Sequence, residues 1–347
     1  MTKIRIGVIG CGSIGRHHLK QLKTLENAGV TAACDIDTGS LETFGREAGI
    51  SSETLHVDYH DLLESGGVDA VLICLPNRYH STVSIEAFKQ GLHVFCEKPM
   101  AINYKEAKKM VKSSKKHRLK LQIGLQNRFR GESQALKHII DQGVLGDIYY
   151  SKCGWLRRRG LPPWGSWFMR HRDSGGGPIM DIGVHVLDLA FWLTSNFSPR
   201  TVYASSYSKL APRFADGARN PEVYDVEDLA SALIKMENEA TVMFEASWVT
   251  NIEGPRFYVE IMGDTAGLDY ESTSLFSTEN GESVDQKIQF KERNPYLEEM
   301  KHFLDCIIHN RDPLTKPEEM LELQKTLDMI TLSSKEDRLV EANEIGR

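Results

Sequence analysis

The sequence predicts an α/β domain with a doubly wound parallel sheet, followed by an α+β domain with a largely antiparallel sheet. Strand and helix patterns alternate through the first third of the 347 residues, which is typical of parallel strands joined by crossover helices. Beyond Leu125, short runs of alternating polarity follow one another with few helical patterns between them, which favours antiparallel strands. We expect the first domain at residues 1–124 and the second at residues 125–347.

The predicted strands of the first domain are nearly continuous in apolar residues, as expected when helices cover both faces of a sheet. These strands are Ile4–Ile9, Val30–Cys34, Ala70–Leu75, His93–Cys96 and Lys120–Gly124. The predicted helices between them carry one apolar face at helical spacing. These helices are Ile14–Asn27, Leu41–Ala48, Tyr59–Glu64, Ser81–Lys89 and Lys105–His117.

In the second domain, the predicted strands alternate in polarity, as in a sheet that is covered on one face. They are Asp147–Gly154, Arg200–Tyr207, Asp228–Met236, Ala240–Thr250 and Phe257–Met262, with a hairpin turn expected at Glu239 and another tight turn at 263–267. The predicted helices are Gly131–Gln142, Ile179–Leu193, Tyr296–His309 and Pro317–Ser333. Ligands of open α/β sheets bind beyond the carboxyl ends of the strands, so we expect the second domain to close over that edge.

Composition and charge narrow the class of protein. The net charge of −6 and the absence of a long basic run argue against nucleic acid as the main partner. No apolar run reaches transmembrane length, and no separate apolar segment precedes the strand residues that begin at Ile4. The six cysteines form no C-x-x-C pair and are interpreted as reduced thiols. The sequence therefore predicts a cytoplasmic protein that does not bind a membrane.

The first predicted strand runs into Gly10-Cys11-Gly12-Ser13-Ile14-Gly15, a Gly-x-Gly-x-x-Gly pattern that opens a helix. Gly10 would allow a sharp turn, Gly12 would leave room for a pyrophosphate, and Gly15 would let the helix approach the strand. The helix N-terminus then offers unpaired N–H groups and a partial positive charge to phosphates. This combination of strand, turn and helix predicts a dinucleotide-binding Rossmann domain.

Asp35 ends the second predicted strand, twenty residues after Gly15. A carboxylate at this place can accept hydrogen bonds from the adenosine ribose hydroxyls and would repel a 2′-phosphate. The next residues, Ile36-Asp37-Thr38, provide no Arg or Lys, so the sequence favours NAD over NADP. The alternative is a glycine-rich turn followed by an unrelated acid.

Two further motifs follow strands of the first domain and so would lie at the cofactor edge. Leu75-Pro76-Asn77 would place Asn77 beside the cofactor, with His80 at a helix start, although a turn with a capping Asn would look the same. Glu97-Lys98-Pro99 follows the next strand, and Lys98 could hydrogen-bond a substrate hydroxyl. A surface ion pair at a turn is the alternative interpretation.

A glycine-rich loop, 174–178, leads into an apolar helix that carries Asp181 and His185 on one face. Oxidation of an alcohol requires a base for the hydroxyl proton, and His185 suits that role because imidazole titrates near neutral pH. Asp181 could orient His185 or bind the substrate hydroxyl. The alternatives are a helix-capping acid with a core histidine, or two metal ligands without the further ligands a metal needs.

Aromatic and basic residues crowd the segment before this loop. Trp faces and guanidinium groups suit a polyhydroxylated ring, which is apolar on one side and forms hydrogen bonds at its edge. A solvated basic loop or a subunit contact is the alternative. The residues are Trp155, Arg157, Arg158, Arg159, Trp164, Trp167 and Arg170, with Arg128 at the domain junction as a similar candidate.

These motifs together resemble the glucose–fructose oxidoreductase, inositol dehydrogenase and rhizopine-catabolism family, written Gfo/Idh/MocA, over essentially the whole chain. The resemblance implies that Lys98, Asp181 and His185 form the catalytic group and that the second domain carries an open sheet. We expect NAD as cofactor and no metal. The expected cofactor-binding residues are Gly10, Gly12, Ser13, Ile14, Gly15, Asp35, Leu75, Pro76, Asn77, His80, Glu97, Lys98 and Gln126, and the expected substrate-binding residues are Lys98, Arg128, Arg157, Trp164, Asp181 and His185.

The resemblance also implies an activity: reversible hydride transfer between the nicotinamide and a ring hydroxyl of a sugar, sugar derivative or cyclitol. It further implies a homodimer or homotetramer assembled through the second sheet. Three alternatives stay open: a glycoside oxidoreductase with tightly bound, internally recycled NAD; a non-catalytic regulator that binds NAD and sugar; and a metal-dependent hydrolase or lyase. The 208–227 segment could be a subunit-contact arm or a lid, and the sequence does not decide between them.

Overall fold

The computed structural model describes residues 3–214 and 223–346, which form two compact units. Unit 1 comprises Met1–Ala101, Lys105–Gln126 and Asn294–Leu321. Unit 2 comprises Ile102–Tyr104, Asn127–Arg293 and Glu322–Arg347. The chain therefore passes from unit 1 to unit 2 close to the expected residue 125, but it returns to unit 1 near its C-terminus, which the sequence did not predict.

Unit 1 contains the predicted parallel sheet, with six strands in the order β3-β2-β1-β4-β5-β6. From β1, the strands follow one another outward to β2 and β3 on one side, and β4, β5 and β6 follow outward on the other side. The strand order therefore reverses between β1 and β4, and sheets of this kind bind ligands at such a point. Only β3 was not predicted, because two residues are too few for a periodic pattern. The strands are β1 Ile4–Ile9, β2 Ala28–Cys34, β3 Leu55–His56, β4 Ala70–Ile73, β5 His93–Glu97 and β6 Leu121–Gly124.

Crossover helices connect these strands, as the alternating pattern predicted. α1 is shorter than expected: it ends at Leu22, because the N–H groups of Thr24 and Leu25 bond three residues back and turn the chain toward β2. The helices are α1 Ser13–Leu22, α2 Thr38–Ala48, α3 Tyr59–Glu64, α4 His80–Lys89 and α5 Tyr104–His117.

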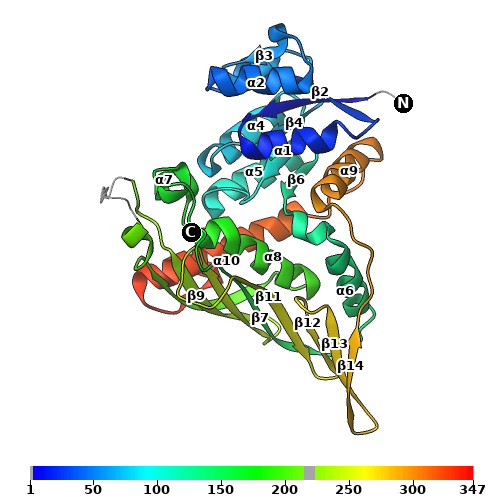
Figure 1. Cartoon of the computed structure of the whole chain (residues 1–347), viewed down its shortest axis with the longest axis vertical. Helices are drawn as coiled ribbons and strands as arrows, with labels where there is room; N and C mark the ends of the chain where they lie inside the picture. The colour runs from blue at the N-terminus through cyan, green and yellow to red at the C-terminus, as the bar shows by residue number, and fades with distance from the viewer. Residues whose placement is uncertain (1–2, 215–222, 347) are drawn as a thin grey trace. The chain divides into compact units, whose positions relative to one another are not determined.

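The segment that returns to unit 1 contains α9, Pro295–Ile308, which the predicted boundary placed in the second domain. Figure 1 shows α9, in orange, beside α1, in blue. Met300, Phe303 and Leu304 of α9 are fully buried in the same apolar cluster as β1 and α1. Residues 294–321 therefore belong to unit 1 and not to the second domain, where the sequence placed them. A sequence pattern shows that a helix has an apolar face, but it does not show which sheet that face covers.

Unit 2 contains a nine-stranded sheet in the order β14-β13-β12-β11-β7-β10-β9-β8-β15. Every neighbouring pair is antiparallel except β10 and β7. The predicted hairpin turn at Glu239 is present, with φ +69°. The strands are β7 Ile148–Leu156, β8 Pro199–Tyr207, β9 Leu229–Met236, β10 Thr241–Ser247, β11 Arg256–Gly263, β12 Ala266–Asp269, β13 Ser274–Glu279, β14 Glu282–Lys287 and β15 Val340–Glu341.

The last four of these strands were not predicted. β13 and β14 carry few apolar residues and are mostly exposed, so they lack the alternation that indicates a half-buried strand. The helices of this part of the chain are α6 Gly131–Asp141, α7 His171–Ser174, α8 Val184–Leu193 and α10 Pro317–Glu336. α8 packs on β7 and β11, and α6 packs on α8, so helices cover one face of the sheet.

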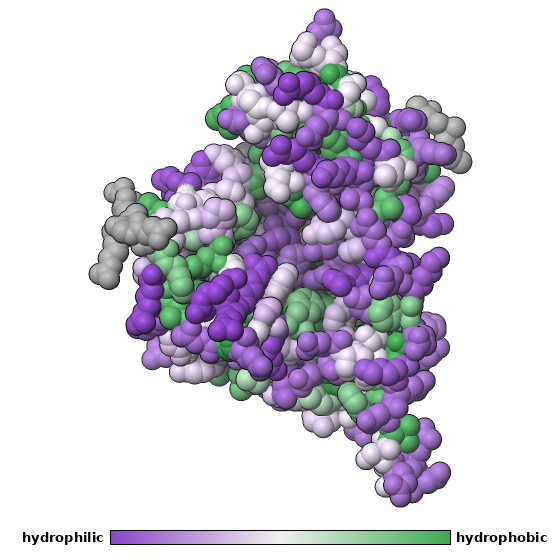
Figure 2. All heavy atoms as spheres, in the orientation of Figure 1, coloured by the Kyte–Doolittle hydropathy of each residue, from purple (hydrophilic) through white to green (hydrophobic). Residues whose placement is uncertain are grey.

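Large apolar side chains lie exposed on adjacent strands of this sheet. Tyr203 of β8 pairs with Leu233 of β9, which pairs with Met243 of β10, and the three are 48%, 54% and 37% exposed. We call Tyr203, Leu233 and Met243 the exposed apolar row. In Figure 2, most of the visible surface is hydrophilic and hydrophobic side chains form small groups.

Two expectations from composition can be compared with the structure. All six cysteines are free thiols; five are buried and Cys74 is half-buried. Burial raises the pKa of the thiols of Cys11 and Cys34 to about 12. Across residues 3–214 and 223–346, no helix combines the length and the apolar character needed to cross a membrane.

Candidate active site

The glycine turn after β1 has the steric features that a dinucleotide requires. Gly10 adopts φ +101°, and a Cβ there would lie 2.3 Å from the Cys74 carbonyl oxygen. A Cβ at Gly15 would lie 2.1 Å from the Gly10 carbonyl oxygen, so only glycine allows α1 to approach the strand. At Gly12, no atom of residues 3–214 or 223–346 lies within 4 Å of the position that a Cβ would take, which leaves its backbone open to a ligand.

The start of α1 and Asp35 complete this part of the site. The first turn of α1 has no acidic residue and no side-chain cap, so its N–H groups suit a phosphate. One Asp35 carboxylate oxygen accepts a hydrogen bond from Cys11 N–H at 2.7 Å, and the other accepts one from Asp37 N–H at 2.9 Å. Asp35 is thus tied to the glycine turn and half-exposed, and its oxygens retain lone pairs for ribose hydroxyls. These residues fit a nicotinamide dinucleotide.

Lys98 follows the end of β5, and the residue before it faces inward. The carboxylate Oε1 of Glu97 lies 2.7 Å from Nε2 of the buried His18 on α1, while Oε2 accepts a hydrogen bond from Lys98 N–H at 3.3 Å. A Cβ at Gly124 would come within 3.1 Å of Oε1, so this glycine makes room for the carboxylate. Glu97 therefore bonds to the protein itself rather than presenting its carboxylate to a cofactor, whereas Lys98 is half-exposed.

His80 also differs from its predicted role. Its ring is fully buried, with Nδ1 2.8 Å from the Pro99 carbonyl oxygen and Nε2 2.9 Å from the Leu75 carbonyl oxygen. Because both ring nitrogens face backbone carbonyls, the expected contact of His80 with a cofactor is corrected: this ring bridges two backbone segments. Asn77, at the start of a short 3₁₀ turn, is also buried.

In unit 2, Asp181 and His185 lie on a helix that is not regular. The predicted continuous helix begins with a π-helical turn, Ile179–Gly183, before α8. Such turns are rare and frequently occur at functional sites. The indole N–H of the buried Trp248 donates a hydrogen bond to Asp181 Oδ2 at 2.9 Å, and His185 is 5% exposed. No group of three or more potential ligands is placed to hold a metal ion among the residues that the structure describes.

The glycine-rich loop before this turn is held by Glu227. Its carboxylate accepts hydrogen bonds from the N–H groups of Gly177 and Ile179, both at 3.0 Å. Burial raises the pKa of Glu227, and the two N–H donors act in the opposite direction. A Cβ at Gly177 would lie 2.1 Å from the Glu227 carbonyl oxygen, which explains the need for glycine.

The sequence did not single out Trp248 or Glu227. Neither belongs to a recognisable motif, because each acts on a residue far away in the sequence. Glu227 lies in the 208–227 segment, whose role the sequence left open; residues 215–222 are outside the described residues. The described end of this segment contributes to the support of the glycine loop.

Some of the predicted substrate-binding residues cluster around Asp181 and His185. The rings of Trp155 and His185 are 5.9 Å apart, and the Arg157 guanidinium lies over Trp155 at 4.6 Å. Burial lowers the pKa of Arg157, while the nearby Asp181 carboxylate raises it. Trp164 stacks instead on Tyr224, at 5.6 Å. Unit 2 therefore brings together an aromatic face, a cation, a carboxylate and an imidazole.

Arg128 does not lie where a substrate could reach it. Its side chain is fully buried and forms a bidentate ion pair with Asp188, with Nη2–Oδ1 at 2.6 Å and Nε–Oδ2 at 3.0 Å. The guanidinium also lies near the rings of Trp192 and Phe197. The prediction of a substrate contact for Arg128 is corrected, because this pair stabilises the packing of α8.

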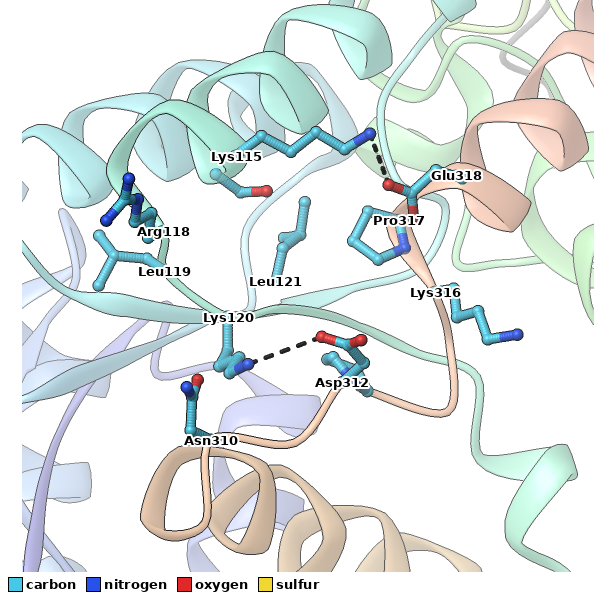
Figure 3. A pocket seen from close by; sticks show the side chains of 12 residues that line it. Lys115, Arg118, Leu119, Lys120, Leu121, Asn310, Asp312, Lys316, Pro317 and Glu318 are labelled. Atoms are coloured by element: carbon cyan, nitrogen blue, oxygen red, sulfur yellow. Dashed lines mark ion pairs between the residues drawn. The ribbon is translucent and has the colours of Figure 1, made fainter.

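A pocket of about 290 Å³ in unit 1 contains none of the predicted site residues. It lies between the end of α5, the start of β6 and the start of α10, at the amino end of β6. Figure 3 shows two ion pairs at this pocket, Lys115–Glu318 at 2.6 Å and Lys120–Asp312 at 3.7 Å. Since nucleotides bind at carboxyl ends of strands, we do not assign this pocket to the active site.

Comparison with known protein families gives two matches that together cover most of the chain. Residues 4–125 match the model of the Gfo/Idh/MocA oxidoreductase family, described as an NAD-binding Rossmann fold. Residues 133–269 match the model of the Gfo/Idh/MocA C-terminal domain. These ranges contain all three residues that the sequence predicted as catalytic.

Individual relatives are similar over nearly the full length. The D-glucoside 3-dehydrogenase of Escherichia coli (strain K12) is 29% identical over 88% of this chain and 88% of its own length. The NAD⁺-dependent scyllo-inositol 2-dehydrogenase of Bacillus subtilis (strain 168) is 29% identical over 90% and 88%. The crystal structure of the aldose-aldose oxidoreductase from Caulobacter crescentus aligns over 98% and 99% with a TM-score of 0.82 and 22% identity, which shows the same fold.

Proposed function

Because this chain belongs to the Gfo/Idh/MocA family of NAD-binding oxidoreductases, we propose that it is a dehydrogenase that oxidises a ring CH–OH group of a sugar, glycoside or cyclitol. The observation that carries the proposal is the cluster in unit 2, where Asp181, His185, Trp155 and Arg157 lie together. An aromatic face with hydrogen-bonding groups at its edge suits a polyhydroxylated ring. The names of the relatives, a glucoside dehydrogenase and an inositol dehydrogenase, support the same substrate class.

Each catalytic residue has a distinct part in the proposed mechanism. When bound, NAD supplies the hydride acceptor. His185 accepts the hydroxyl proton, since a neutral imidazole nitrogen is a suitable base near neutral pH. The Lys98 ammonium donates a hydrogen bond to the same oxygen and stabilises its developing negative charge. Asp181, held by the Trp248 indole, orients the substrate or His185.

We propose NAD rather than NADP as the cofactor, and Asp35 is the residue that supports this preference. Replacing Asp35→Ser removes the charge that would repel a 2′-phosphate. The ratio of kcat/KM with NAD to that with NADP is expected to fall at least about tenfold. Asp37→Ser is the matched control, because Asp37 caps α2 with a side chain that serine can replace. An unchanged ratio in Asp35→Ser would remove this residue from cofactor selection.

The proposed function is tested by following NADH formation with purified protein. NAD and NADP are offered separately with inositols, aldoses, glycosides and sugar acids. Reduction of NAD with one ring class supports the proposal and identifies the substrate family. If no substrate reacts, the protein is denatured and the supernatant is assayed for NAD, since release of bound cofactor would indicate an enzyme that recycles it internally. Absence of both turnover and NAD binding would contradict the proposal.

We further propose that the chain forms a homo-oligomer through the sheet of unit 2. The exposed apolar row, Tyr203, Leu233 and Met243, supports this, because apolar side chains in register on a sheet are typical of a surface buried by a second subunit. Leu233→Lys is expected to lower the mass measured by light scattering during size-exclusion chromatography. Val57→Lys, at an exposed apolar residue of unit 1, is the control. An unchanged mass for Leu233→Lys would exclude this surface as the interface.

A further inference from the structure

Two buried histidines, His18 on α1 and His80 at the start of α4, contact the residues on either side of Lys98. His18 contacts the carboxylate of Glu97, and His80 contacts the backbone carbonyl of Pro99. Both histidines are fully buried and all of these residues belong to unit 1. The proposed mechanism uses neither histidine, and their burial keeps them away from a substrate.

The first contact continues to Lys98 itself. Glu97 Oε1 receives the hydrogen bond of His18 at 2.7 Å, and Oε2 accepts the backbone N–H of Lys98 at 3.3 Å. His18 Nδ1 is buried and has no hydrogen-bond partner among the residues that the structure describes, so Nε2 is the ring nitrogen through which His18 acts. The Glu97 carboxylate thus connects His18 of α1 with the backbone N–H of Lys98.

The second contact fixes the other side of Lys98. His80 Nδ1 lies 2.8 Å from the Pro99 carbonyl oxygen and Nε2 lies 2.9 Å from the Leu75 carbonyl oxygen. The ring therefore connects the segment that follows β4 with the segment that follows β5. Carbonyl oxygens only accept, so a protonated ring donates to both of them and a neutral ring donates to one. Burial lowers the pKa of His80, while Glu97 raises it and Lys98 lowers it further.

We propose that His18 and His80 are positioning residues for Lys98: they hold residues 97 to 99 so that the ammonium group is directed at the reacting oxygen. This inference rests on the proposed role of Lys98. It assigns no contact with cofactor or substrate to either histidine. A small displacement of a catalytic group can lower a rate about 100-fold, so loss of this support has a measurable effect on kcat.

The side chains of Asn and Gln allow each contact to be tested separately. The amide of Gln can replace the Nε2 donor of a histidine, and that of Asn can replace the Nδ1 donor. His18→Gln keeps a donor toward Glu97, whereas His18→Leu removes it. His80→Asn keeps a donor toward Pro99, whereas His80→Gln keeps only the one toward Leu75. His17→Leu is the matched control, because His17 is the neighbouring residue on α1 and packs on Tyr296.

Three quantities are measured for each variant: the melting temperature, the Kd for NAD, and kcat with KM for the sugar. His18→Leu and His80→Gln are expected to lower kcat about 10- to 100-fold with little change in the Kd for NAD. His18→Gln and His80→Asn are expected to retain most of the wild-type kcat, and His17→Leu all of it. If His18→Leu and His80→Gln fold and keep the wild-type kcat, or if His18→Gln and His80→Asn lose activity in proportion to the fall in their melting temperature, the proposal is overturned.

A measurement without turnover separates this proposal from the proposed function. The rate at which the Lys98 amine is reductively methylated is followed by peptide mass spectrometry in each variant. His18→Leu and His80→Gln are expected to change this rate relative to wild type, while the rate at Lys20, on the exposed side of α1, stays constant. Changed Lys98 labelling in a protein that oxidises no sugar would support the positioning role and contradict only the proposed function. Unchanged labelling would contradict the positioning role whatever the activity.

Discussion

Replacing His185→Gln is expected to lower kcat by about 10²- to 10⁴-fold, which is the contribution of a positioned general base. Gln fills a similar volume and forms hydrogen bonds, but it cannot accept the hydroxyl proton. His185 is 5% exposed and packs beside Trp155. Because Gln fills a similar volume at this buried position, the variant is expected to fold. The measurement is kcat by NADH absorbance over a range of pH, together with the Kd for NAD.

The pH profile distinguishes loss of a base from loss of packing. In the wild type, kcat is expected to fall at acidic pH as His185 becomes protonated, and this fall is expected to be absent from His185→Gln. The Kd for NAD is expected to stay near the wild-type value, because the glycine turn and Asp35 belong to unit 1. His138→Gln, at an exposed histidine of α6, is the control. Retention of the acidic limb in His185→Gln would show that another group is the base.

Replacing Asp188→Ala is expected to lower the free energy of unfolding by about 3–5 kcal/mol, because the Arg128 guanidinium would remain buried without its carboxylate. Both side chains are fully buried, and they pair in a bidentate geometry. For a unit of this size, such a change corresponds to a melting temperature about 10 °C lower. Differential scanning calorimetry measures it, and the kcat of the folded fraction is expected to be near that of the wild type.

The double variant Arg128→Met with Asp188→Leu tests the physical reason for this loss. Replacing a buried ion pair by apolar residues of similar volume is often neutral or stabilising, so the double variant is expected to be more stable than Asp188→Ala. Equal destabilisation in both variants would show that packing around α8, rather than an unpaired charge, is the cause. A loss of kcat larger than the loss of stability would restore the predicted role of Arg128 in the active site.

Much of the first unit could be predicted because its signals are local. The strand before Gly10, the glycine turn and the acid that follows β2 depend on short-range periodicity and on the space that a Cβ would occupy. Element type was therefore predicted well, whereas the end of α1 was placed five residues too late. Strands such as β13 were missed because most of their residues are polar and carry no alternation.

The candidate site likewise contains residues that the sequence could indicate and residues that it could not. The motifs that contain Asp35, Lys98, Asp181 and His185 are visible in the sequence, since each is a short run with a fixed spacing. The residues that support them are not, because Glu97 bonds to a histidine 79 positions away and Asp181 to a tryptophan 67 positions away. Arg128 illustrates the opposite error: a charged residue near a motif suggested a substrate contact, yet its partner lies 60 positions later.

The sequence by itself determined the two kinds of sheet, the glycine turn and the resemblance to a family of oxidoreductases, and it predicted Lys98, Asp181 and His185 as catalytic. Only the tertiary structure decided that α9 belongs to unit 1 and that Arg128 pairs with Asp188 inside unit 2. It also decided that two buried histidines contact the Glu97–Pro99 segment. The physical reason is that backbone periodicity and glycine sterics depend on neighbouring residues. The burial of a charge or an imidazole depends instead on partners that only folding brings together.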